Sequence, residues 1–143
     1  MHEMSLVRPV VDIVLKSCEG KNVGAVRTVN LTIGETHDVV NELVPGLFRY
    51  LARGTVAENA EVLIRTIPLT VQCDGCGAIF RIDVHDQATW RCPQCGARQN
   101  YHLYSGQEFR IDSIEVEWAD EVQAERRQVN EIERTAAVEA GAA

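Results

Sequence analysis

The sequence of 143 residues lacks any uninterrupted apolar stretch near the ~20 residues that a membrane-spanning helix needs. It also lacks a basic excess, because 21 acidic residues outnumber 14 lysines and arginines and give a net charge of -7. These shortages argue against a membrane protein and against a protein that binds nucleic acid through a broad basic surface. The first twenty residues lack the basic flank and clean apolar run of a signal peptide, so we expect a cytoplasmic protein.

Recognisable catalytic arrangements are missing as well. The sequence shows no nucleophile–base pair, no glycine loop of the kind that cradles phosphates and no closed set of carboxylates, so we do not expect an enzyme. Cysteine is scarce but patterned: four of the five cysteines form two close pairs. In a reducing compartment, such pairs indicate metal binding rather than disulfides.

The paired cysteines have the spacing of a zinc site. Cys73, Cys76, Cys92 and Cys95 form C-x2-C-x15-C-x2-C, in which each short turn aims two sulfurs at one ion. Four thiolates complete a tetrahedron and leave no open position, so we expect a structural zinc site. A thioredoxin-like redox pair fits less well, because the strand-to-helix setting is missing. Iron in a rubredoxin-like site has the same ligands and stays open as an alternative.

Hydrophobic periodicity predicts the elements before these cysteines. We expect a helix over Leu6–Cys18 that Pro9 either begins or bends, and then a half-buried strand that ends at Gly34. A second helix is predicted from about Asp38, with a kink or a break at Pro45-Gly46. Its predicted buried stripe is Val40, Leu43, Val44, Leu47, Phe48 and Leu51. Residues 61–67 alternate like a second strand.

The sequence after the cysteines returns to strand-like alternation. Residues 109–118 predict a final strand, and a change of phase near Asp112-Ser113 predicts a β-bulge there. The fold class is therefore α+β: a small three-stranded sheet packed with two helices, plus an inserted zinc-ribbon module. We divide the chain into an α+β domain (1–70), a zinc-ribbon insert (71–106), a final strand that returns to the first domain (107–118) and an acidic, alanine-rich tail (119–143), which is either a solvated helix or frayed.

The amino terminus offers a second metal site. Because His2 is large, Met1 should be retained, which places a free amine, an imidazole and the main-chain amides near Glu3 within chelating reach. Planar nitrogen coordination is favoured by Ni(II) and Cu(II) and is not required by Zn(II). The alternative is that His2 is incidental and that Glu3 merely places a negative charge at a helix start.

Several stretches together resemble the HypA/HybF family of nickel maturation factors. They are MHEMSLV, LTIGE, RGTVAENAEVLI, the cysteine pairs CDGC and CPQC, and SGQEFRIDSIEVE, which span about residues 1–118. The resemblance implies Ni(II) held by the Met1 amine, His2 and the main chain around Glu3, with zinc held by the four cysteines. It also implies a HypB-like GTPase partner and delivery of nickel to the hydrogenase large subunit or the urease maturation machinery. Some family members have a histidine after each cysteine pair, where Gly77 and Gly96 stand here.

Two hypotheses follow from the sequence. In the first, the chain is a nickel metallochaperone with a structural zinc site. In the second, it is a zinc-ribbon protein-interaction module without a nickel function. The insert carries three acids and three arginines, which disfavours nucleic acid as its partner but not protein.

Overall fold

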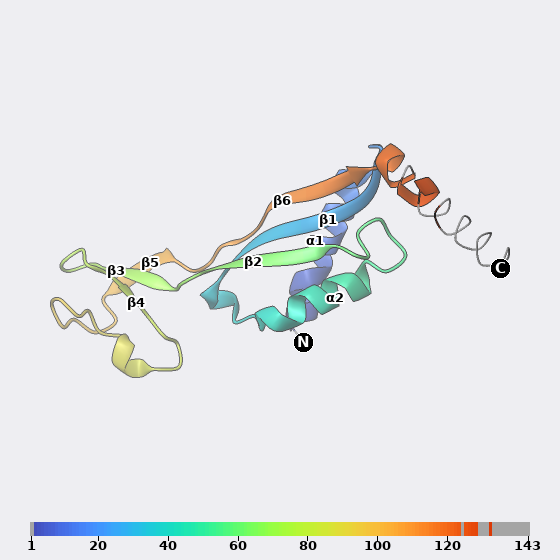
Figure 1. Cartoon of the computed structure of the whole chain (residues 1–143). Helices are drawn as coiled ribbons and strands as arrows, with labels where there is room; N and C mark the ends of the chain where they lie inside the picture. The colour runs from blue at the N-terminus through green and yellow to red at the C-terminus, as the bar shows by residue number, and fades with distance from the viewer. Residues whose placement is uncertain (1, 124, 129–131, 133–143) are drawn as a thin grey trace.

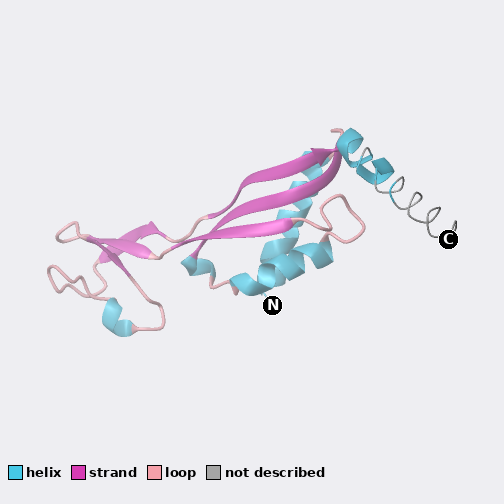
Figure 2. Ribbon diagram, viewed as in Figure 1, coloured by secondary structure: helices cyan, strands magenta, loops and turns pink. Residues whose placement is uncertain are grey.

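The computed structural model describes residues 2–123, 125–128 and 132, and for His2 it describes the backbone alone. Two small sheets lie one after the other along the molecule, and both long helices pack against the first sheet (Figure 1). The second sheet, with its long loops, extends away from that body (Figure 2). The start of the first helix lies beside the second helix (Figure 1).

The first sheet has the strand order β2-β1-β6. Its strands are β1 (Val23–Gly34), β2 (Glu61–Ile67) and β6 (Phe109–Trp118). β1 runs parallel to β2 and antiparallel to β6. Asn30 pairs with Ser113 while the next residue, Leu31, pairs with Ile111, so Asp112 is an extra residue in the ladder. The predicted bulge is therefore confirmed, and so is the predicted fold class.

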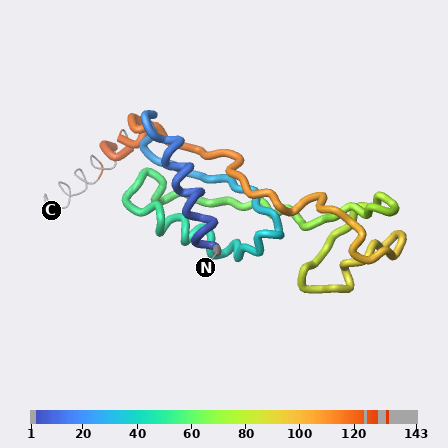
Figure 3. Tube along the Cα trace, turned by 180° about the vertical axis from the view of Figure 1, so that it is seen from behind, coloured from blue at the N-terminus to red at the C-terminus, as the bar shows by residue number. Residues whose placement is uncertain are grey.

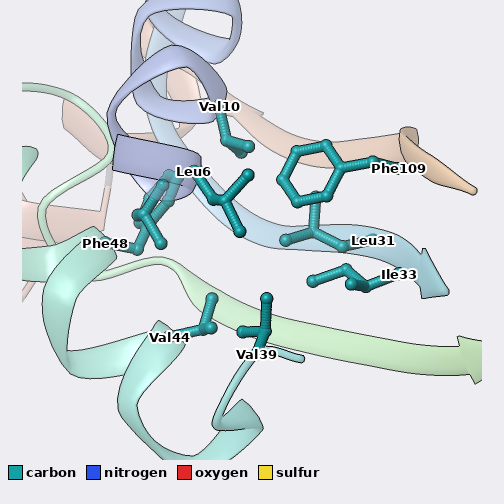
Figure 4. Close-up of a pocket in the computed structure, with 9 residues that line it drawn as sticks. Leu6, Val10, Leu31, Ile33, Val39, Val44, Phe48 and Phe109 are labelled. Carbon is teal, nitrogen blue, oxygen red and sulfur yellow. The ribbon is translucent and has the colours of Figure 1, made fainter. Parts of the chain in front are cut away.

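The two helices, α1 (His2–Cys18) and α2 (Val44–Leu51), cover one face of this sheet (Figure 3). The core that they form is mostly aliphatic, with the buried ring of Phe48 in it and the partly buried ring of Phe109 packed against it. Leu6 and Val10 of α1 approach Leu31 of β1 and Phe109 of β6 across a gap of about 10 Å3 (Figure 4). That gap is roughly the size of one water molecule, so the core of this sheet is no small-molecule pocket.

The first helix starts earlier than its sequence predicted. It begins at His2 rather than Leu6, and Pro9 lies inside it, so the option in which Pro9 begins the helix is wrong. Proline removes one main-chain hydrogen bond from a helix interior. Burial of Val7 on the amino-terminal side of Pro9 and Val10 beyond it offsets that loss, because both side chains are 3% exposed or less.

The second helix starts later than predicted. A 3-10 turn over Asn41–Leu43 precedes it, and Pro45 occupies its first turn. Proline is tolerated there because the first N–H groups of a helix have no partner within the helix. The predicted kink is therefore wrong, whereas the predicted break is found, because the α-helix begins at Val44 after the separate 3-10 turn. Val40 and Leu43, which the predicted stripe placed in the core, are about half exposed.

The second sheet has the order β4-β3-β5 and surrounds a small core of its own. Its strands are β3 (Thr70–Cys73), β4 (Ile79–Arg81) and β5 (Tyr101–Ser105). The joint to the first sheet is tight: a Cβ on Gly34 would lie 2.0 Å from the Gly106 carbonyl oxygen. The Glu35 carboxylate accepts a hydrogen bond from the Leu69 N–H (2.9 Å) and pairs with Arg81, so one side chain ties the two sheets together.

A helix follows β6, over residues 119–123 and 125–128. It starts against β1 at Gly24, where an added Cβ would lie 2.8 Å from both the Ala119 backbone and the Val122 side chain. Apart from residue 132, the rest of the predicted tail lies outside the described residues. None of the helices in the described part of the chain is long and apolar enough to cross a membrane.

Candidate metal sites

Two turns with the same main-chain hydrogen bonds carry the four cysteines. The Gly77 N–H donates to the Cys73 carbonyl and the Gly96 N–H to the Cys92 carbonyl, each at 2.9 Å. Both glycines have positive φ, 78° and 76°, a conformation that a Cβ makes costly. The turn therefore favours the glycine after each C-x-x-C pair.

The turns bring all four sulfurs into one cluster. The Sγ atoms of Cys73, Cys76, Cys92 and Cys95 lie within 4.8 Å of one another. The Cys73–Cys95 sulfurs are 3.6 Å apart and the Cys76–Cys92 sulfurs 3.5 Å apart. Zn–S bonds of about 2.3 Å place the sulfurs of a tetrahedral site about 3.8 Å apart, so the cluster has the right size for one zinc ion. Disulfides are excluded at these distances, because bonded sulfurs lie about 2.05 Å apart.

Main-chain N–H groups stabilise two of these thiols as thiolates. The Cys76 N–H lowers the pKa of Cys73, and the Cys95 N–H lowers the pKa of Cys92 to about 6. The Ala78 N–H acts in the same direction on Cys76, but the neighbouring Cys92 sulfur and burial outweigh it and raise the pKa of Cys76 to about 12. Sulfurs packed this closely cannot all ionise together unless a cation lies among them, which is the environment that a divalent metal provides.

Of the residues predicted to hold nickel, the structure describes only the His2 backbone and Glu3. Met1 and the His2 side chain are outside the described residues, while the His2 backbone begins α1. The Glu3 carboxylate accepts a hydrogen bond from the Val40 N–H at 3.4 Å. This contact links the first turn of α1 to the segment that precedes α2.

The remaining histidines have contacts of their own. The His37 Nε2 lies 3.0 Å from the Gln107 carbonyl oxygen, and the ring meets Phe109 edge-on. The His102 Nδ1 lies 2.6 Å from an Asp74 carboxylate oxygen. Within the described residues, the only groups of three or more His, Cys, Asp or Glu side chains with metal-ligand geometry come from the four cysteines.

The contact between Glu35 and Arg81 was not predicted from the sequence. The two residues are 46 positions apart, and no local pattern relates them. The only sequence signal was the change in composition after residue 69, where cysteine, glycine and turn residues become frequent. This change marks a domain boundary but does not identify the residues that contact each other across it. This ion pair joins β4 of the cysteine-bearing sheet to the residue that directly follows β1.

A family model described as "Hydrogenase/urease nickel incorporation, metallochaperone, hypA" matches residues 1–116. The match includes the amino terminus, both sheets and all four clustered cysteines. The chain belongs to the HypA family. HypA proteins are nickel metallochaperones of hydrogenase maturation, and residues 117–143 lie beyond the matched region.

Individual HypA proteins are similar over the same region. The hydrogenase maturation factor HypA of Caldanaerobacter subterraneus subsp. tengcongensis is 35% identical over 117 residues, which cover 82% of this chain and all of that protein. The HypA of Geobacter sulfurreducens is 38% identical with the same coverage.

Solved HypA structures show the same fold. The solution structure of the nickel metallochaperone HypA from Helicobacter pylori superposes with a TM-score of 0.53 at 20% identity, covering 80% of this chain and 96% of that one. A second solution structure of a HypA protein gives a TM-score of 0.57 at 22% identity and covers 82% and 97% of the two chains.

Proposed function

We propose that this protein is a cytoplasmic nickel carrier that binds Ni(II) at its amino terminus and delivers it for [NiFe]-hydrogenase maturation. The observation that carries this proposal is the family match from residue 1, which includes the Met-His-Glu start. The ligands are the Met1 amine, the His2 imidazole and the main-chain amides at His2 and Glu3. The protein acts without catalysis, together with a HypB-like GTPase, and supplies the hydrogenase large subunit or the urease maturation machinery.

The helix start suits this coordination. An amide nitrogen binds a metal in a planar chelate only after it loses its proton, which would break a hydrogen bond in the middle of a helix. His2 and Glu3 lie in the first turn of α1, where main-chain N–H groups have no acceptor within the helix, so deprotonation there breaks no α-helical hydrogen bond. Nickel binding therefore releases protons and weakens as the pH falls.

The four cysteines hold a structural zinc ion in this proposal. When bound, zinc neutralises the crowded thiolates and crosslinks the two turns of the 71–106 insert. The small apolar core of that insert gives it little stability of its own, whereas structural zinc sites contribute about 10–16 kcal/mol of binding free energy. Thiolates for zinc and nitrogens for nickel keep the two metals at separate positions by ligand preference.

Delivery follows from the build of the terminal site. The proposed nickel site belongs to the 1–70 domain, whose sheet is completed by the strand 107–118. Its ligands are mostly groups at the chain end, so they do not form a rigid cage. A ligand from an incoming partner can replace these donors one at a time and draw the metal away. The separate zinc site keeps its ion throughout.

Isothermal titration of Ni(II) into zinc-loaded protein with its native terminus tests the proposal. We expect one nickel per chain with a Kd of about 1 µM or below, and loss of this binding in His2→Ala and in a variant with one extra residue before Met1. His85→Ala is the matched control, because it removes an exposed histidine from the zinc-bearing insert.

Two results would contradict the assignment. If the extended variant binds nickel as tightly as the native protein, the amine is not a ligand. If the native protein itself binds no nickel, the zinc-ribbon interaction module becomes the better description.

A further inference from the structure

The zinc-bearing insert carries two arginines side by side. Arg91 and Arg98 face each other in an isolated antiparallel bridge. Residues that are directly opposite in such a bridge project to the same side, so the two guanidinium groups extend over one surface. Both side chains are exposed, and neither has an ion-pair partner among the residues that the structure describes.

The acids of the insert are engaged elsewhere. Asp74 contacts His102, Asp83 accepts a hydrogen bond from the main-chain N–H of His85, and Asp86 caps a 3-10 turn through the N–H of Ala88. The insert has equal numbers of acidic residues and arginines, but the two arginines of this bridge lie apart from the contacts that the acidic residues make. The arginine pair therefore forms a local positive surface that the sequence count conceals.

This surface is hollow. A concavity of about 630 Å3 is lined by the two arginines together with Gln87, Ala88, Trp90 and Gln99. Its lining contains no carboxylate. Paired guanidiniums in a polar hollow match the planar, bidentate geometry of a carboxylate group.

An apolar groove of about 340 Å3 continues from this hollow, and Trp90 and Gln99 line both. The groove is lined mainly by aliphatic side chains, of which Val84 is 53% exposed and Leu103 39% exposed. The Trp90 indole between the two hollows is held in place, because its Nε1–H donates to the Asp83 carbonyl at 2.9 Å. A fixed aromatic wall between an apolar groove and a cationic hollow is typical of a peptide-binding surface.

We propose that this continuous surface binds a peptide segment of a partner protein in which a carboxylate lies next to a large apolar side chain. The guanidiniums of Arg91 and Arg98 take the carboxylate, and the groove beside Trp90 takes the apolar side chain. A nucleic acid fits less well, because the groove is apolar and a net charge of -7 repels a polyanion. The proposal does not rest on nickel binding, which is assigned to residues 1–3 rather than to the insert.

A defined probe can test this. Trp118→Phe leaves Trp90 as the only tryptophan, so its fluorescence reports the surface directly. Zinc-loaded protein is titrated with the capped peptide acetyl-Gly-Leu-Glu-Gly-amide, and amide chemical shifts are followed in parallel. We expect roughly millimolar binding, with shifts confined to the region of Trp90, Gln99 and Leu103. The peptide with Gln in place of Glu should bind roughly tenfold more weakly, and so should the peptide with Gly in place of Leu.

Variants of the protein complete the experiment. Arg91→Gln/Arg98→Gln should weaken binding of the Glu peptide roughly tenfold and leave that of the Gln peptide unchanged. Arg49→Gln, an exposed arginine on α2, should change neither. Zinc content is measured for each variant. If the double variant loses zinc, the comparison of the Glu and Gln peptides on protein with intact Arg91 and Arg98 still tests whether a carboxylate is recognised.

Three outcomes would overturn the proposal. Equal binding of the Glu and Gln peptides would show that no carboxylate is recognised. Unchanged binding to a zinc-loaded double variant would place the site elsewhere. Tighter binding of a hexathymidylate than of the peptide would assign the surface to nucleic acid. Nickel titration of the same variants separates this proposal from the nickel function, because the double variant should still bind one nickel.

Discussion

Truncation of Phe48 tests whether the two sheets have independent cores. Phe48 is fully buried between α2, α1 and the first sheet. Core Phe→Ala changes cost about 3–5 kcal/mol, and more when neighbours cannot close the space. The ring already borders the gap of about 10 Å3, so its removal enlarges an existing void. We therefore expect the upper part of that range, about 4–5 kcal/mol.

The expected change in melting temperature is large. A domain of 60–100 residues shifts by about 4–8 °C per kcal/mol, so Phe48→Ala should lower the transition of the first sheet by about 16 °C or more. The second sheet has its own core around Val71, Phe80 and Ile82, and we expect its zinc to stay bound through that transition. Circular dichroism follows the helices while a chromogenic chelator detects released zinc. Tyr50→Ala is the matched control on the same helix, because its ring is exposed and stacks with Arg53.

Two results would refute this reasoning. A loss of stability below about 2 kcal/mol would show that the site collapses around the missing ring. Zinc release in step with helix loss in Phe48→Ala would show that the two sheets unfold as one unit. The Tyr50→Ala control should remain within about 1 kcal/mol of the parent protein.

Two further changes address the zinc cluster and the sheet. Cys92→Ser should lower zinc content to well below one per chain and broaden the amide spectrum of the insert, while the signals of α1 and β1 stay dispersed; a fully loaded variant would show that three thiolates suffice. Asp112→Asn should lose stability at neutral pH, because hydrogen bonds from Thr32 and then Arg110 lower the pKa of this carboxyl in the folded protein. The ionised carboxylate therefore stabilises the folded protein at any pH above the unfolded-state pKa of about 3.9. This stabilisation is lost as the pH falls through the lower pKa of the folded state. Urea unfolding from pH 7 to pH 3 should therefore show the parent and the variant converging at acid pH, and a constant gap would contradict this cause.

Patterns with a short period were predictable from the sequence. The alternation of residues 109–118 indicated a strand, and its change of phase indicated the bulge at Asp112, because side chains on a strand alternate between two faces. The cysteine spacing predicted the four-sulfur cluster for a similar reason. Each C-x-x-C turn is complete within five residues, from Cys73 to Gly77 and from Cys92 to Gly96.

Helix boundaries depended on packing and were predicted less well. Pro9 and Pro45 both looked like interruptions, yet one lies inside α1 and the other in the first turn of α2. A proline removes one hydrogen bond from a helix. Whether the helix still forms depends on how much apolar surface it buries against residues far away in the chain. The exposed Val40 and Leu43 show the same limit, because a periodic stripe does not say which of its members reach the core.

The sequence by itself determined the four clustered cysteines, the Met-His-Glu start and the strands of the first sheet. These features depend on neighbouring residues and on covalent spacing. Only the tertiary structure decided which distant residues meet. It placed Glu35 against Arg81 at the joint between the sheets, Gly24 beneath the helix that follows β6, and Arg91 beside Arg98 next to an apolar groove. Such contacts join residues that no local period relates, and they form only when the chain buries its apolar surface and the sheets close around their two cores.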